Sequence, residues 1–156
     1  MFDIILTSSI LALLFGCAYN DLTCGRIPNV LNLMIFSAAL IRAFFFPSFG
    51  VSINQALTSA GIIILIGFAL WRFRFIGAGD IKMLAAVSAL TNLSTLPNFM
   101  FLVALVAGIQ AIIFSKLQTQ FRIVFTKDDA RGKRTMPMGV SIAISAALFV
   151  FFIDIM

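Results

Sequence analysis

The sequence predicts an all-α fold, a polytopic membrane bundle of about six transmembrane helices. We expect both termini outside and one membrane-embedded domain over residues 1–156. Hydrophobic residues make up 62% of the chain, and the mean hydropathy is +1.11. Charged residues make up only 11%, whereas soluble domains have roughly 25%. The apolar residues also gather into long runs, most of which approach the roughly 20 residues that a helix needs to cross a bilayer.

The apolar runs predict helices over residues 4–19, 30–46, 53–71, 75–96, 99–114 and 140–155. The first run could instead be a lipoprotein signal peptide that is cleaved before Cys17. A signal peptide begins with positive charge, and this chain begins with "MFD", so we expect a retained helix. The second run follows Pro28 and Asn29, which suit the start of a helix.

The fourth run is interrupted. Its uninterrupted apolar part, Ile81 to Leu90, has ten residues, which is too short to cross a bilayer. We therefore expect the fourth helix to reach back through Asp80 towards Phe75, which places Asp80 in the membrane near its cytoplasmic boundary. The fifth run follows the polar stretch "TNLSTLPN", and the sixth begins at "MPMGV", where a helix stops and restarts.

Basic residues predict the orientation of these helices. The first, third and fifth connections and their edges hold Arg26, Arg72, Arg74, Lys82, Lys116, Arg122, Lys127, Arg131, Lys133 and Arg134, which are all but one of the 11 basic residues. The even connections, "PSFGVS" and "TNLSTLPN", have none. Because cytoplasmic loops are enriched in Lys and Arg, the odd connections face the cytoplasm. Arg42 stands apart, and we expect it to reach the outer interface by snorkelling.

Several kinds of active site are excluded by composition. The chain has no His, and all six of its acidic residues are Asp. A site built on imidazole, as a metal ligand or as the base of a nucleophile, is therefore excluded. Cys17 and Cys24 are seven positions apart and form no CxxC pair, so we expect neither a metal nor a redox site. We expect no cofactor.

Asp80 is the first candidate functional residue, since acids in membrane segments are costly and usually functional. Asp21 is its best partner, because it lies at the cytoplasmic end of the first helix, on the same membrane face. Two neighbouring carboxylates do not easily both ionise and tend to share one proton. One can then activate water while the other protonates the substrate, as in aspartic peptidases. Gly77 and Gly79 leave the backbone beside Asp80 open to an extended substrate.

The other acids have simpler interpretations. Asp128 and Asp129 lie in a basic loop and are expected to be solvated, and Asp3 and Asp154 lie on the opposite face. The sequence "GAGD" could also be a small-residue helix contact with Asp80 as its N-cap. Lys82 is two positions beyond Asp80, does not face it on a regular helix and is expected to anchor at the interface.

The net charge is +5, and we expect the basic residues to bind anionic lipid and not nucleic acid. Six of the basic residues lie in the fifth connection, where we expect them to bind anionic headgroups of the bilayer. The sequence leaves the oligomeric state open.

Three stretches resemble the prepilin leader peptidases of type IV and Flp (tight-adherence) pilus systems, which are GxGD-type aspartic membrane peptidases. They are "DLTCGRIPN" from Asp21, "GAGDIKMLAA" from Gly77 and "MPMGVSIAI" from Met136. The resemblance implies a peptidase that removes a short, positively charged leader from prepilin-like proteins at the cytoplasmic face of the inner membrane. It implies Asp21 and Asp80 as the catalytic pair. The supporting motif residues would be Gly77, Gly79, Lys82, Pro28 and Asn29.

Larger members of that family carry an N-terminal cytoplasmic region and also methylate the new N-terminus. Because this chain enters its first apolar run at once, we expect no such region and no methyl transfer. Two other functions remain open from the residues. The same carboxylates could bind ions in a small transporter, or the pair could be vestigial in a non-catalytic assembly factor of a pilus or secretion machine.

Overall fold

The computed structural model describes residues 2–25, 27–46, 51–74, 76–120 and 138–155. Over these ranges the chain forms six helices and no strand: α1 (Phe2–Cys24), α2 (Asn29–Phe45), α3 (Ile53–Arg72), α4 (Ala78–Ser88), α5 (Leu96–Gln120) and α6 (Met138–Ile155). The all-α class is therefore confirmed. The basic residues Arg122 to Arg134 of the fifth connection, which we expect to bind lipid, lie outside the described residues.

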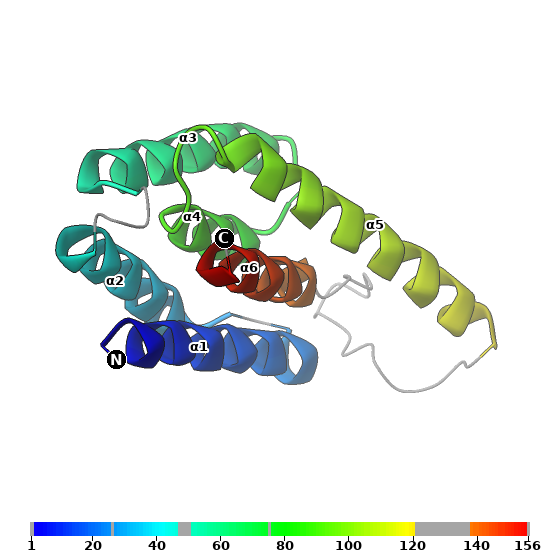
Figure 1. The fold of residues 1–156 in the computed structure, drawn as a ribbon. Helices are drawn as coiled ribbons and strands as arrows, with labels where there is room; N and C mark the ends of the chain where they lie inside the picture. The colour runs from blue at the N-terminus through cyan, green and yellow to red at the C-terminus, as the bar shows by residue number, and fades with distance from the viewer. Residues whose placement is uncertain (1, 26, 47–50, 75, 121–137, 156) are drawn as a thin grey trace.

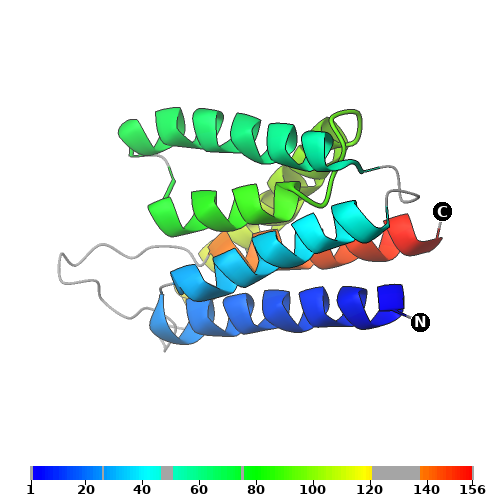
Figure 2. The same ribbon diagram turned by 90° about the vertical axis from the view of Figure 1, so that its left-hand side faces the viewer.

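Successive helices run in opposite directions. Figures 1 and 2 show that α1 and α3 end, and α2, α4 and α6 begin, at one end of the bundle. The start of α1 and the end of α6 lie together at the other end, as Figure 2 shows. The first and third connections and the start of α6 thus share one end, and the start of α1 and the end of α6 share the other, which agrees with the arrangement that the charge pattern predicts. We call the first of these the basic end.

The short helix α4 lies inside the bundle, where it packs against α2, α3 and α6. Small residues allow this close packing, because a Cβ on Gly67 of α3 would collide with Ile81 Cγ2 of α4. Both helices also have buried alanines, which are Ala56 and Ala60 on α3 and Ala85, Ala86 and Ala89 on or just after α4. The Ser59 hydroxyl also donates to the Thr91 carbonyl at 3.1 Å, which ties α3 to the end of α4.

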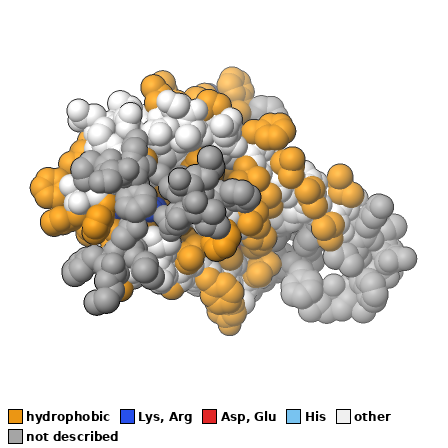
Figure 3. Space-filling view, in the orientation of Figure 1, with side chains coloured by type: hydrophobic (Ala, Val, Ile, Leu, Met, Phe, Trp, Pro, Cys, Tyr) orange, Lys and Arg blue, Asp and Glu red, His pale blue; other side chains and the backbone are white. Residues whose placement is uncertain are grey.

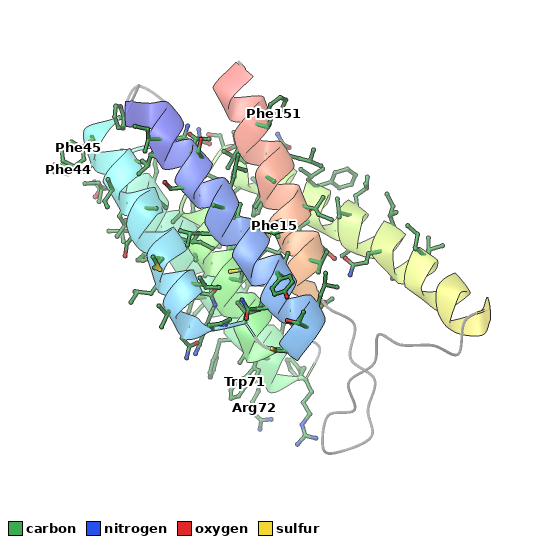
Figure 4. The ribbon with its side chains drawn as sticks, turned by 90° about the horizontal axis from the view of Figure 1, so that it is seen from below. Phe15, Phe44, Phe45, Trp71, Arg72 and Phe151 are labelled. Atoms are coloured by element: carbon green, nitrogen blue, oxygen red, sulfur yellow. The ribbon has the colours of Figure 1, made fainter. Side chains whose placement is uncertain are left out.

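Helix α5 packs on α6 and extends away from the bundle at its C-terminal end (Figures 1 and 4). The rings of Phe99 and Phe149 meet with their centroids 5.2 Å apart. Closer to the basic end, the Ser141 hydroxyl donates to the side-chain oxygen of Gln110. Polar side chains placed between apolar helices are commonly satisfied in this way.

The fourth and fifth helices differ from the predicted boundaries of 75–96 and 99–114. Helix α4 has only 11 residues, about 16 Å at 1.5 Å per residue, so it does not cross a bilayer core of about 30 Å. Beyond it, the Thr91 hydroxyl bonds to the Ser88 carbonyl, and Asn92 Oδ1 accepts from the Thr95 N–H at 2.8 Å. These side-chain bonds give hydrogen-bond partners to backbone groups of the turn before α5. Helix α5 begins at Leu96, three residues earlier than predicted.

Helix α1 also continues beyond its predicted end at residue 19. Asn20 and Thr23 bond through their side chains to helix carbonyls four residues earlier, at 2.9 and 2.8 Å, so they do not interrupt the helix. The helix ends where Gly25 adopts a φ of +60°, a left-handed conformation that favours glycine. Asp21 therefore lies in the last turn of α1, and the connection to α2 is short.

Within the described ranges, three helices are long and apolar enough to cross a membrane by length and composition: Ile5–Cys24, Ile53–Arg72 and Leu96–Ile113. The apolar helices Asn29–Phe45 and Met138–Phe151 are shorter. Large apolar side chains are exposed on the outside, among them Phe15, Leu65 and Phe101, each more than 70% exposed. Figure 3 shows such side chains over much of one face of the molecule. Outward-facing apolar residues suit a helical protein surrounded by lipid.

The prediction that Arg42 reaches the interface by snorkelling is wrong. Arg42 is only 5% exposed and lines a small cavity between α2 and the end of α4, together with Ala39, Ala43, Phe46, Val51, Ala89 and Leu90. Arg42 itself lies in the last turn of α2. A cation beside the C-terminal end of a helix is favoured by the helix dipole.

Candidate functional site

Asp21 lies at the basic end of α1 and is 8% exposed. Its Oδ2 accepts a hydrogen bond of 2.8 Å from the backbone N–H of Gly139. The N–H of Val140 also donates to this carboxylate. Both donors belong to the first turn of α6, where backbone N–H groups have no partner within the helix. The carboxylate of α1 thus accepts from the exposed donors at the N-terminus of α6, where negative charge is favoured.

Asp80 lies at the same end of the bundle, in the first turn of α4. Gly77 is the N-cap of this helix, and the Asp80 carboxylate accepts the Gly77 N–H. The expectation that Asp80 itself could be the N-cap is therefore wrong, since it occupies the third helical position and bonds back to the cap. This is the reciprocal half of a capping box. The side chain of Asp80 is half-buried, and Gly77 and Ala78 beside it are exposed.

The two aspartates come close enough to interact electrostatically, since the charge of Asp21 acts on Asp80. Ile27 lies between the segments that carry them. Its Cβ is 4.0 Å from a Cβ placed on Gly79, beside Asp80, and its Cδ1 is 2.7 Å from a Cβ placed on Gly139, beside Asp21. Helices α1, α4 and α6 therefore converge around one pair of carboxylates.

The supporting motif residues lie around this pair. Pro28 is the N-cap of α2, and its carbonyl accepts from the N–H groups of Leu31 and Asn32 at 3.2 and 3.4 Å. Lys82 is exposed and does not bond to Asp80. Its Nζ donates to Asn29 Oδ1 at 3.0 Å, so it joins the first turns of α2 and α4.

The basic end has further polar groups at its rim. Figure 4 shows Trp71 and Arg72 at the end of α3, with the Arg72 side chain pointing away from the bundle. Cys17 is buried one turn before Asp21, and Cys24 is exposed; both are free thiols. Among the residues that the structure describes, no three His, Cys, Asp or Glu side chains come together as a metal-binding group.

Sequence reasoning missed the part that α6 plays at this site. It interprets "MPMGV" as the restart of a helix and as part of the resemblance to the leader peptidases, but it assigns no role to Gly139 or Val140, although both donate to Asp21. The available signal was a glycine in the first turn of an apolar helix at the same membrane face as Asp21.

The fold and the site define a helical membrane protein with a pair of carboxylates at one end of its bundle. The chain belongs to the type IV leader peptidase family, which it matches over residues 8–112. The matched region contains both Asp21 and Asp80 and ends before α6 begins. No curated protein and no solved structure matches the chain. Membership of the family makes the protein a peptidase, and the resemblance seen in its motifs is confirmed.

Proposed function

We propose that the protein is an aspartic endopeptidase that removes the leader from prepilin-like proteins at the cytoplasmic face of the inner membrane. Asp21 and Asp80 are its catalytic pair. The observation that carries this proposal is the convergence of the two carboxylates, from helices far apart in the sequence, at the basic end of the bundle. Membership of the leader peptidase family supports it.

The chemistry needs one carboxylate ionised and one protonated. The ionised carboxylate takes a proton from water as the water oxygen attacks the carbonyl carbon of the scissile peptide bond. The protonated carboxyl gives its proton to the carbonyl oxygen. When the C–N bond breaks, the nitrogen takes the proton held by the first carboxyl, and the hydroxyl proton returns to the second. The pair thus ends in its starting state, with one new acid and one new amine formed.

The position of Asp80 suits an extended substrate backbone. It is half-buried at the rim of the bundle, and the exposed Gly77 and Ala78 beside it have little side-chain bulk. A substrate strand can therefore approach the carboxylate from this side. An apolar substrate helix in the bilayer would bring the segment just outside the membrane to the same depth.

The orientation and lipid contacts are part of the same proposal. With the basic end at the cytoplasmic face, the protein is a multi-pass protein of the inner membrane. The basic residues of the fifth connection then attract anionic headgroups. Because those residues repel a basic leader, the apolar helix of the substrate, and not its leader, provides most of the attraction.

The test is cleavage of a prepilin by the purified protein in liposomes, with the mass of the product measured. Asp21→Asn and Asp80→Asn should each abolish cleavage, since neither variant keeps a pair that can share a proton. Asp154→Asn is the matched control, because residue 154 lies on α6 at the opposite end of the bundle. It should cleave at the wild-type rate.

Cleavage at the normal rate by both Asp21→Asn and Asp80→Asn would exclude the aspartic mechanism. A wild-type protein that cuts no prepilin, while restoring pilus assembly in cells, would instead indicate a non-catalytic assembly factor. The measured mass also shows where the leader is cut and whether a methyl group has been added.

A further inference from the structure

Gly139 lies in the first turn of α6 and contacts one carboxylate of the pair. It is buried, and its N–H donates to Asp21 Oδ2 at 2.8 Å. It lies outside residues 8–112, the region that matches the leader peptidase family. The contact joins residues 118 positions apart in the chain, so it forms only when α6 has packed against α1.

The space around Gly139 leaves no room for a side chain. A Cβ at this position would lie 2.8 Å from Asp21 Oδ2, 3.1 Å from Asp21 Cγ and 2.7 Å from Ile27 Cδ1. Non-bonded carbon atoms normally stay about 3.5–4.0 Å apart. Even one methyl group would therefore push on the Asp21 carboxylate, on Ile27 or on both.

The two carboxylates are held in different ways. Asp80 accepts from Gly77, three residues earlier on its own segment, so α4 can set its position alone. Asp21 lies on α1 and accepts from the first turn of α6. Its position relative to Asp80 therefore depends on a neighbouring helix and on the absence of a side chain there.

We propose that Gly139 is a positioning residue of the peptidase, which fixes the Asp21 carboxylate through its N–H and through its missing side chain. This inference rests on the proposed function for its effect on the rate. It assigns to α6, which lies outside the matched region, a direct part in building the site. Gly139 acts through Asp21 and not on the substrate.

The first arm of the test measures cleavage kinetics. Gly139→Ala should lower kcat by about 100-fold and leave KM within about twofold, because a small displacement of a reacting group is costly while substrate binding is untouched. Gly108→Ala is the matched control, since a Cβ there meets nothing within 4 Å. A Gly139→Ala enzyme with a kcat within about threefold of the Gly108→Ala control would overturn the proposal.

A second arm separates the two contacts. Ile27→Val removes Cδ1, the Ile27 atom that a Cβ on Gly139 would meet, and leaves the clash with Asp21 in place. The kcat of the Ile27→Val/Gly139→Ala protein should therefore be about 100-fold lower than the kcat of the Ile27→Val protein. Recovery of kcat in the Ile27→Val/Gly139→Ala protein would mean that the defect is only a packing clash, and the proposal would be wrong.

A third arm needs no catalysis. Thermal unfolding in detergent is measured for Gly139→Ala in the wild-type and in the Asp21→Ala background. Asp21→Ala removes the carboxylate that a Cβ would meet. The decrease in Tm caused by Gly139→Ala should therefore be about 2–4 °C smaller in the Asp21→Ala background than in the wild-type background. Equal shifts in both backgrounds would refute the contact. If wild-type protein cuts no prepilin, the proposed function fails, and this arm still decides whether Gly139 fixes Asp21.

Discussion

Lys82 Nζ lies 3.0 Å from Asn29 Oδ1, and this hydrogen bond joins the first turns of α4 and α2 at the basic end of the bundle. One partner is two residues beyond Asp80, and the other follows the connection that carries Ile27. The bond therefore fixes the short segment after α1 with respect to the helix that holds the second carboxylate.

Removing this bond should weaken the bundle modestly. We expect a coupling free energy of about 0.5–1 kcal/mol between Lys82→Met and Asn29→Ala, because a hydrogen bond at an exposed site is worth about that much. Unfolding of the two single variants and the double variant in mixed micelles gives the coupling. Lys82→Arg keeps a cationic donor and should retain part of it. Strictly additive single effects would mean that the bond contributes nothing in the membrane.

The two glycines before Asp80 should respond differently to substitution. A Cβ on Gly77 would lie 2.9 Å from Asp80 Oδ2, whereas one on Gly79 would make an ordinary 4.0 Å contact with Ile27. The φ of Gly77 is −70°, so alanine meets no backbone strain there. We expect Gly77→Ala to lower kcat more than tenfold relative to the wild type, because it displaces the Asp80 carboxylate. The kcat of Gly77→Ala should also be about tenfold lower than that of Gly79→Ala.

The stability of the Gly79→Ala variant provides the control for the comparison of the two glycines. Gly79 lies within α4, so alanine should stabilise that helix by about 0.5–1 kcal/mol. Comparable losses of kcat in the two variants, measured on the same prepilin, would show that the spacing to Asp80 does not distinguish them.

The dependence of cleavage on pH should be bell-shaped. At low pH both carboxyls carry protons and no base is left, and at high pH both are ionised and no acid is left. The rate should therefore fall on both sides of an optimum. The measurement is kcat/KM against pH in liposomes, with the pH equal on both sides of the membrane. A profile with only one limb would show that a single titrating group controls the reaction.

Thiol labelling tests which end of the bundle faces the cytoplasm. Cys24 is exposed at the basic end, and Cys17 is buried in the core. A membrane-impermeant maleimide should label Cys24 in inverted inner-membrane vesicles and leave it unlabelled in intact spheroplasts. Cys24→Ala should remove the labelling, because Cys17 stays protected. Labelling in spheroplasts alone would reverse the orientation proposed for the site.

The amount that the sequence could predict differs between parts of the molecule. Apolar runs and charge bias predict the number of helices and the end at which Asp21 and Asp80 lie, because both depend on composition along the chain. The length of α4 was overestimated, since a helix surrounded by protein need not span the bilayer. The contact between Gly139 and Asp21 could not be predicted, because it depends on how α6 packs beside α1. The burial of Arg42 likewise depends on how α2 packs beside the residues that end α4.

The collision that any side chain on Gly67 would have with Ile81 has a consequence for where hydrolysis can take place. Ile81 directly follows Asp80, and it sits in the notch that Gly67 leaves in α3. Helix α4 therefore cannot slide along α3 without leaving that notch. Helix α3 is long and apolar enough to cross a membrane, so this contact fixes the height of Asp80 along a candidate membrane span. Under the proposed function, a substrate must bring its scissile bond to that height before it can be cut.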